Sequence, residues 1–178
     1  MTPAELKALV RTVPDFPRAG IQFRDITTLL ADGRGLTAAV EQISQRANAI
    51  GCGAIAGIEA RGFIFGAAVA SLLMLGFVPV RKPGKLPVPT IGVDYSLEYG
   101  LSRLELDSTL IAPGERVIVV DDLIATGGTA LAAAQLLRRA GAVVDRALFV
   151  IELPDLGGAT LLREHGIEVE ALIAFEGD

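Results

Sequence analysis

The sequence predicts one α/β domain built on a mostly parallel, twisted sheet that helices flank. The 178 residues of the chain are the usual length of a single domain. From residue 51 onward, short runs rich in β-branched residues alternate with helical patterns, which is typical of parallel strands joined by helices. Hydrophobic residues make up 51% of the chain and charged residues 21%, so a packed core is expected and a disordered chain is excluded.

The N-terminal part of the chain is expected to form two helices with a loop between them. The first helix begins at Pro3, because Thr2 can cap it and Glu5 completes a capping box with Thr2. Two prolines in the segment 13–20 end this helix and predict a loop. Apolar residues at helical spacing then predict an amphipathic helix over 33–50.

The remainder of the chain is expected to alternate strands and helices. Residues 91–95 and 102–106 flank a glycine-containing segment and predict a hairpin or a flexible flap. The run 116–121 is mostly β-branched, which is the pattern of a strand buried on both faces. The other predicted elements are a strand at 54–58, a helix at 63–75, a strand at 77–81, a helix at 129–140, a strand at 143–151, a helix at 155–165 and a strand at 168–175.

Charge and cysteine content exclude several classes of function. The chain has 21 acidic and 16 basic residues and a formal charge of −5, without a basic block, so we expect no nucleic-acid partner. Cys52 is the only cysteine, which excludes an internal disulfide and a cysteine-rich zinc site and favours a cytoplasmic location. The N-terminus lacks the pattern of a signal peptide. The uncharged segment 64–80 is better explained by a buried helix that runs into a strand than by a membrane span, so no membrane partner is expected.

The most informative segment is the buried strand 116–121 with the loop that follows it. Two carboxylates, Asp121 and Asp122, stand at its carboxyl end, where open parallel sheets bind ligands. In the loop, glycines let backbone N–H groups approach an anion, and the N-terminus of the next helix adds its positive dipole end. The candidate phosphate-binding residues are Ala125, Thr126, Gly127, Gly128 and Thr129.

This segment has other interpretations. A plain strand–turn–helix junction would need only a threonine cap and a glycine turn. The magnesium-binding strand of a nucleoside triphosphatase would require a partner G-x-x-x-x-G-K-[ST] loop, which the chain lacks. The glycines of 51–57 precede their strand and do not match a dinucleotide fingerprint. Because carboxylates accept hydrogen bonds from sugar hydroxyls while the loop takes a phosphate, a phosphorylated ribose fits both halves of the segment.

The segment resembles the phosphoribosyl pyrophosphate (PRPP) motif of the type I phosphoribosyltransferases, with four apolar residues, two acidic residues and a Thr-Gly-Gly-Thr loop. Further blocks resemble the adenine phosphoribosyltransferase family, in the family's order. These are VPDFP at 13–17 with GIQFRDIT at 20–27, GIEARGFIFG at 57–66, RKPGKLP at 81–87 and YSLEYG at 95–100. Together they run from residue 13 to about 152, most of the chain. Thr28 is a small departure, where many members have proline.

The resemblance implies both a fold and a reaction. It implies one phosphoribosyltransferase domain over 1–178, with an N-terminal base-binding hood at 1–32 and a flexible flap at 82–106. The implied reaction joins adenine to PRPP and gives AMP and pyrophosphate. The implied cofactor is Mg²⁺ that PRPP and water hold, without direct protein ligands. A homodimer is also implied, with the apolar helix 63–75 as a candidate interface unless one subunit buries it fully.

For the phosphorylated half of the substrate, the resemblance implies that Asp121 and Asp122 bind the ribose. Arg61 lies after a strand at the same sheet edge and can fork onto phosphate oxygens, although it could instead form a surface pair with Glu59. Three cations of the next block are also assigned to pyrophosphate, although such a cluster is often only a solvated loop; they are Arg81, Lys82 and Lys85.

For the base, the resemblance implies that Phe23 stacks on the purine, although by pattern alone it could be a core residue. Glu98 is the implied general acid/base toward the ring nitrogens, against the alternative of an exposed hairpin glutamate. Tyr99 is the flap residue expected to close over the site. The adenine-binding set is Gln22, Phe23, Arg24 and Ile124.

Two other functions stay open on the sequence. The chain could transfer the ribosyl group to another base, such as hypoxanthine, guanine or xanthine. It could also be a PRPP-sensing module without catalysis, although Arg61, Glu98 and the cationic block at 81–85 weigh against that.

Overall fold

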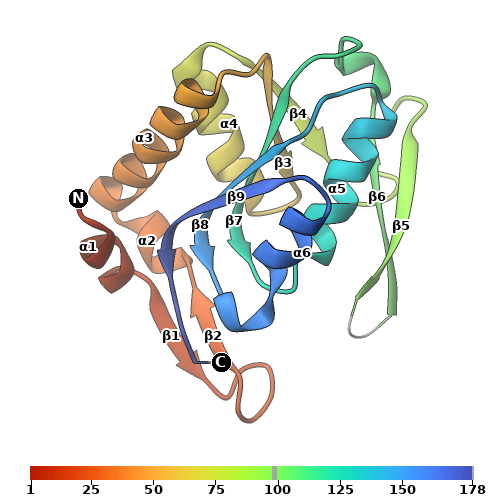
Figure 1. Ribbon diagram of the computed structural model, residues 1–178. Helices are drawn as coiled ribbons and strands as arrows, with labels where there is room; N and C mark the ends of the chain where they lie inside the picture. Colours follow the sequence, from red (N-terminus) through yellow and green to blue (C-terminus); the bar gives the residue numbers. More distant parts are fainter. Residues whose placement is uncertain (98–99, 178) are drawn as a thin grey trace.

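The central element is a sheet of five parallel strands in the order β4-β3-β7-β8-β9 (Figure 1). The computed structural model describes residues 1–97 and 100–177. The strands of this sheet are β3 (Ala54–Ile58), β4 (Gly76–Val80), β7 (Val117–Ile124), β8 (Arg146–Glu152) and β9 (Glu168–Ala174). The α/β fold with a parallel sheet flanked by helices, predicted from the sequence, is therefore confirmed.

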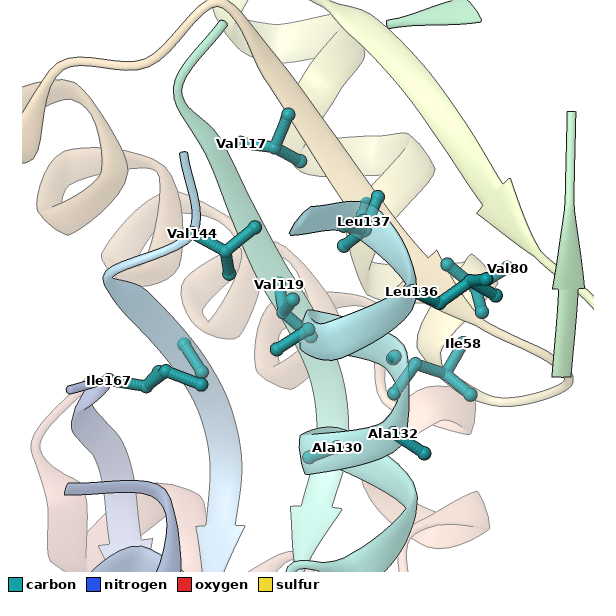
Figure 2. Close-up of a cluster of buried hydrophobic side chains, with 14 of the residues drawn as sticks. Ile58, Val80, Val117, Val119, Ala130, Ala132, Leu136, Leu137, Val144 and Ile167 are labelled. Atoms are coloured by element: carbon teal, nitrogen blue, oxygen red, sulfur yellow. The ribbon is translucent and has the colours of Figure 1, made fainter. Parts of the chain in front are cut away.

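Each face of the sheet packs on its own hydrophobic cluster. Along β7, Val117 and Val119 point into one cluster with α5 (Gly128–Arg139) and α6 (Gly158–Glu164). Figure 2 shows side chains of this cluster, with those of α5 packed over the sheet. Ile118 and Val120, which alternate with them, belong to the second cluster with α3 (Gly33–Ile50) and α4 (Gly62–Leu73). The central strand is buried on both faces, as its β-branched sequence predicts.

The N-terminal segment combines an expected helix with an unexpected hairpin. Helix α1 (Pro3–Ala8) has the predicted capping box between Thr2 and Glu5. The segment expected to be a loop instead contributes to an antiparallel pair of short strands, β1 (Arg11–Pro14) and β2 (Gln22–Asp25). Arg11 and Asp25 are paired in register and form an ion pair. Four-residue strands that carry prolines and charges lack the alternation that identifies a strand in sequence.

Two helices follow this hairpin, and α3 has the predicted bounds. Helix α2 (Thr27–Ala31), which the sequence did not predict, ends directly before α3. The Asp32 side chain caps α3 by accepting a hydrogen bond from the Gly35 N–H at 2.7 Å. Helix α4 ends at Leu73 before β4 begins at Gly76, as expected for a helix that runs into a strand. No helix in the described ranges 1–97 and 100–177 is long and apolar enough to span a membrane.

The predicted hairpin is formed by β5 (Ile91–Leu97) and β6 (Gly100–Leu106), which stand beside α5 (Figure 1). The short helix η1 (Ser108–Leu110) connects this hairpin to the sheet. The helix predicted at 155–165 is divided into η2 (Pro154–Leu156) and α6, because Gly157 between them has a left-handed φ of 73°. Such a conformation interrupts a right-handed helix.

Candidate active site

The carboxyl ends of β3 and β7 bring the predicted Arg61 and Asp pair together. Arg61 follows β3, and its Nε forms an ion pair with the Asp122 carboxylate, whose residue is only 4% exposed. The alternative surface pair of Arg61 with Glu59 is wrong, because Glu59 pairs with Arg81 at 3.1 Å. Strand β7 continues to Ile124, so both carboxylates lie within the strand rather than after it.

Asp121 is held tightly against the start of α4. Its Oδ1 accepts a hydrogen bond from the Asp122 N–H at 2.8 Å. A Cβ atom on Gly62 would lie 2.7 Å from the same oxygen, so only glycine allows this approach. Gly62 was not among the predicted site residues, although its place directly after Arg61 was a usable signal.

Burial and charge set the electrostatics of this trio. Burial raises the pKa of Asp121 well above its ordinary value, and the neighbouring Asp122 carboxylate raises it further. Burial would lower the pKa of Arg61, but the charge of Asp122 and its hydrogen bond raise the pKa overall. The edge of the sheet therefore holds two closely spaced acids, and within the described ranges 1–97 and 100–177 only Asp122 forms an ion pair with a cationic side chain.

The predicted phosphate loop forms a hollow of about 110 Å³ at the N-terminus of α5. Gly127 has a left-handed φ of 81°, and a Cβ atom there would lie 2.8 Å from the carbonyl oxygen of Gly158. The Gly158 N–H in turn donates to the Ala125 carbonyl at 3.0 Å. The hollow is lined by Asp121, Leu123, Ile124, Ala125, Thr126, Gly127, Gly128, Thr129 and Ala130. Unpaired N–H groups of a first helical turn and hydroxyls are suitable donors to an anion.

A larger cavity of about 440 Å³ adjoins this hollow, and Leu123 and Ala125 line both. Phe23 belongs to its wall and packs edge-on against Phe16, with ring centroids 5.2 Å apart. Phe23 is only partly buried and lies outside both described core clusters, which disfavours the reading of a plain core residue. The full lining is Gly20, Ile21, Gln22, Phe23, Arg24, Arg61, Leu123, Ala125, Leu153 and Leu156.

Ile124 does not line the larger cavity, although it was predicted to belong to the adenine-binding set. Its side chain is 2% exposed, packs in the cluster under α5 and borders the smaller hollow instead of the larger cavity. Side chains alternate along a strand, so Leu123 faces the larger cavity where Ile124 was expected. Leu153 and Leu156, which the sequence analysis missed, follow the neighbouring strand β8, and their place after the carboxyl end of a parallel strand was a signal for them.

The predicted cationic block is partly anchored. Arg81 pairs with Glu59 and donates to the Lys85 carbonyl at 3.3 Å, while the Lys82 N–H donates to Glu59 at 3.0 Å. The hydrogen bond from Arg81 and that from the Lys82 backbone lower the pKa of Glu59. The side chains of Lys82 and Lys85 are exposed. Glu59 therefore anchors the start of the segment 81–85, whereas the ammonium groups of Lys82 and Lys85 stay exposed at the surface.

The hairpin β5–β6 reaches the phosphate loop, since a Cβ atom on Gly128 would meet the Ser96 carbonyl oxygen at 3.7 Å. Glu98 and Tyr99, predicted as acid/base and flap residue, lie outside the described residues.

Residues 25–155 match the family model of the phosphoribosyl transferase domain. The adenine phosphoribosyltransferase of Erythrobacter litoralis is 66% identical over 177 residues, which is 99% of each chain. The crystal structure of adenine phosphoribosyltransferase from Thermoanaerobacter pseudethanolicus superposes with a TM-score of 0.92 at 44% identity, covering 98% of this chain and 100% of that one. The Saccharomyces cerevisiae enzyme, complexed with adenine and an imino-altritol bisphosphate, gives 0.90 at 36% identity, covering 96% and 97%.

The residues that the family model matches include the blocks at 57–66, 81–87 and 95–100 and the phosphate-loop segment. The similar chains extend over almost the whole length, and so also over the N-terminal block at 13–27. The chain therefore belongs to the phosphoribosyl transferase domain family.

Proposed function

We propose that the protein is an adenine phosphoribosyltransferase, which transfers the 5-phosphoribosyl group of PRPP to adenine and releases AMP and pyrophosphate. The observation that carries this proposal is that the phosphate hollow and the larger cavity adjoin and share Leu123 and Ala125. A ribose 5-phosphate bound in the hollow directs its anomeric carbon toward a cavity that suits a planar base. The names of the relatives support adenine as that base.

The 5′-phosphate is bound by the loop from Ala125 to Thr129, through backbone N–H groups and the two threonine hydroxyls. Asp121 and Asp122 then accept hydrogen bonds from the ribose hydroxyls. Ribosyl transfer develops positive charge on the sugar ring, and two fixed carboxylates beside the ring stabilise that charge.

The leaving pyrophosphate carries the opposite charge, and we assign it to Arg61, Lys82, Lys85 and the anchored Arg81. Arg61 is half exposed and borders the base cavity, so it stands between the two reacting groups. When pyrophosphate binds, the guanidinium of Arg61 exchanges Asp122 for phosphate oxygens. Asp122 is then available to the ribose.

The chemistry of the donors fits Mg²⁺ carried by its substrate. Asp121 and Asp122 offer carboxylate oxygens, the ligands that Mg²⁺ prefers, and the two residues suit an ion that keeps waters and phosphate oxygens as its other ligands. When bound, Mg²⁺ neutralises charge on the pyrophosphate. The residues that would hold it, through water and not as direct ligands, are these two aspartates.

In the larger cavity, Phe23 stacks on adenine and the backbone of residues 22–24 reads the edge of the base, with Leu123 as the apolar surface opposite. Glu98 exchanges a proton with the purine nitrogens, and Tyr99 covers the closed site; both roles rest on the resemblance of the YSLEYG block. The hood at 1–32 and the flap at 82–106 are the parts of the single domain 1–178 that enclose the substrates.

The deciding experiment incubates the pure protein with PRPP, Mg²⁺ and one base at a time: adenine, hypoxanthine, guanine and xanthine. We expect AMP from adenine, with the other bases consumed far more slowly. Efficient product from another base would reassign the specificity. PRPP binding without product from any base would indicate the non-catalytic sensor instead.

We further propose that the protein acts in the cytoplasm as a homodimer. Helix α4 is not fully buried within one chain, because Ile64 is 42% exposed and Leu72 is 55% exposed. Met74, directly after the helix, is 93% exposed. A partner that covers these side chains would remove apolar surface from water.

A further inference from the structure

The C-terminal segment lies against the hood, although it is the part of the chain farthest from the hood in sequence (Figure 1). The Gly177 carbonyl accepts a hydrogen bond from Arg24 Nη2 at 3.1 Å. The Gly177 N–H donates to Asp155 Oδ2 at 2.8 Å. Arg24 belongs to β2 and Asp155 to η2, so one residue of the tail is bonded to both segments.

Both of these segments contribute to the wall of the base cavity. The hood contributes residues 20–24 to its lining, and the η2 region contributes Leu153 and Leu156. Gly177 is thus bonded to two segments of the cavity wall, through Arg24 and Asp155, that are 155 − 24 = 131 positions apart in sequence.

Phe175 provides a second attachment. It is 8% exposed, and its N–H donates to the Glu152 carbonyl at the end of β8 at 3.0 Å. The Arg24 guanidinium and the Lys7 ammonium each lie 4.6 Å from the centroid of its ring. Both cations are placed to interact with the aromatic face. The ring therefore joins α1 and β2 to the end of the sheet.

The guanidinium of Arg24 is held by three contacts. Its Nη1 donates to Thr12 Oγ1 at 2.7 Å, its Nη2 donates to Gly177, and its plane lies over Phe175. A long side chain fixed at its end holds its own backbone in place, and here that backbone is the part of β2 that lines the cavity. The tail therefore anchors the side chain of a residue that lines the cavity.

We propose that residues 175–177 form a C-terminal strap that positions both walls of the base cavity, so that recognition of adenine depends on a segment that does not touch it. This inference rests on the proposed function. A slot for a planar base requires two walls at a fixed separation, and holding them before the base arrives lowers the ordering cost of binding. Phe175, Gly177 and Asp155 are then positioning residues.

The test compares the wild type with two variants, Asp155→Ala and a chain that ends at Phe175. We expect the KM for adenine to rise about tenfold in each, while kcat and the KM for PRPP stay within about twofold. In the part of the chain that the structure describes, neither the phosphate loop nor Asp121 or Asp122 is hydrogen-bonded to the strap, which is why the effect should be confined to adenine binding. Asp155→Ala removes one exposed carboxylate, so it keeps the test decisive if the shortened chain does not fold.

Two comparisons separate positioning from general damage. Phe175→Tyr keeps the aromatic ring and should keep the KM for adenine, whereas Phe175→Leu should raise it. Because Asp155 acts through Gly177, adding Asp155→Ala to the shortened chain should have no further effect. Glu164→Ala is the matched control, since it removes an exposed carboxylate from α6, away from the strap.

An unchanged KM for adenine in folded Asp155→Ala and Phe175→Leu proteins would overturn the proposal that the strap positions the cavity walls. Equal increases in both KM values would also overturn it, since a loosened fold would explain them. Failure of the proposed function is a different result, because the wild type itself would then form no AMP from adenine and PRPP.

Discussion

At the scale of single residues, the adjacent Gly127 and Gly128 are required for different reasons: Gly127 for the backbone conformation and Gly128 for access of the phosphate. Among the described residues, a Cβ atom on Gly128 would meet only the Ser96 carbonyl oxygen, at an ordinary 3.7 Å, so Gly128→Val should fold. The methyl groups of the new valine would project toward the proposed phosphate site. The KM for PRPP should therefore rise roughly tenfold or more, which corresponds to ~1.4 kcal/mol of binding free energy.

Gly127 has a left-handed φ of 81°, so Gly127→Val should instead destabilise the fold by about 1–3 kcal/mol. Steady-state kinetics and thermal unfolding distinguish the two, and normal PRPP kinetics in Gly128→Val would contradict the assignment.

Asp121 is expected to lower the stability of the fold while it contributes to the binding of PRPP. Burial and then the Asp122 charge raise its pKa, so the folded state disfavours the ionised carboxylate that neutral pH imposes. Asp121→Asn should therefore raise the Tm at pH 7, by about 2–4 °C for each ~1 kcal/mol recovered. The gain should vanish as the pH falls toward about 4, where the carboxyl is protonated in the unfolded chain as well.

The same Asp121→Asn variant should show a higher KM for PRPP, because the proposed ribose contact loses its charge. Asp122→Asn is the contrasting variant. It leaves Arg61 without its carboxylate and should lower the Tm. A Tm unchanged or lowered in Asp121→Asn would show that the acid is not destabilised by its surroundings.

Glu98 carries the proposed proton transfer. Glu98→Gln keeps the size of the side chain and removes its titratable proton, so kcat should fall by about 10²–10⁴ while PRPP binding changes little. Asp94→Asn is the control on the same hairpin, where it removes an exposed carboxylate that pairs with Arg103 at 3.0 Å. Near-normal turnover in Glu98→Gln would make Glu98 an ordinary surface residue.

At the scale of elements, the hood hairpin is fastened by Asp25. Hydrogen bonds from the Thr27 hydroxyl, Arg11 and the Thr27 N–H lower the pKa of Asp25 to about 2. A carboxyl with a lowered pKa stabilises the fold above about pH 4, the unfolded value, and this contribution is lost as the pH falls through about 2.

Asp25→Asn should thus lower the Tm at pH 6, and the Tm curves of variant and wild type should converge as the pH approaches about 2. Thermal unfolding of both proteins between pH 6 and about pH 2 measures this difference in Tm. Glu41→Gln, an exposed residue of α3, is the control and should follow the wild type throughout. A constant difference between Asp25→Asn and wild type at every pH would mean that the titration of Asp25 does not stabilise the hood.

Elements with a strong local signal were predictable from the sequence, and those with a tertiary cause were not. Helix α3 has 18 residues of helical periodicity, and β7 has a β-branched run, so both were found. The hairpin β1–β2 was missed, because its four-residue strands depend on the Arg11–Asp25 pair across the turn. In the site, Asp121, Asp122 and the loop follow from local sequence, whereas Leu153 and Leu156 enter the cavity only through the order of the strands.

At the scale of the whole molecule, the proposed homodimer gives a clear expectation. Light scattering at micromolar concentration should report about twice the 18.6 kDa mass of the chain. Leu72→Glu places a charge on the exposed face of α4 and should shift the mass to that of one chain, because a buried unpaired charge opposes association. Leu101→Glu, on the 83% exposed side chain of β6, is the control and should leave the mass unchanged. A single-chain mass for the wild type would exclude the dimer.

Because Arg61 already pairs with Asp122, the entry of PRPP is an exchange of counter-ions rather than the simple capture of an anion by waiting cations. Arg81 is likewise matched by Glu59 before any ligand arrives. Two of the four proposed pyrophosphate cations therefore contribute little net field at long range, in a chain whose overall charge is −5. Dissolved salt screens the attraction of the exposed Lys82 and Lys85, but it acts less on a contact that replaces one partly buried ion pair by another. The affinity for the polyanionic substrate is thereby made less sensitive to ionic strength than the number of basic side chains suggests.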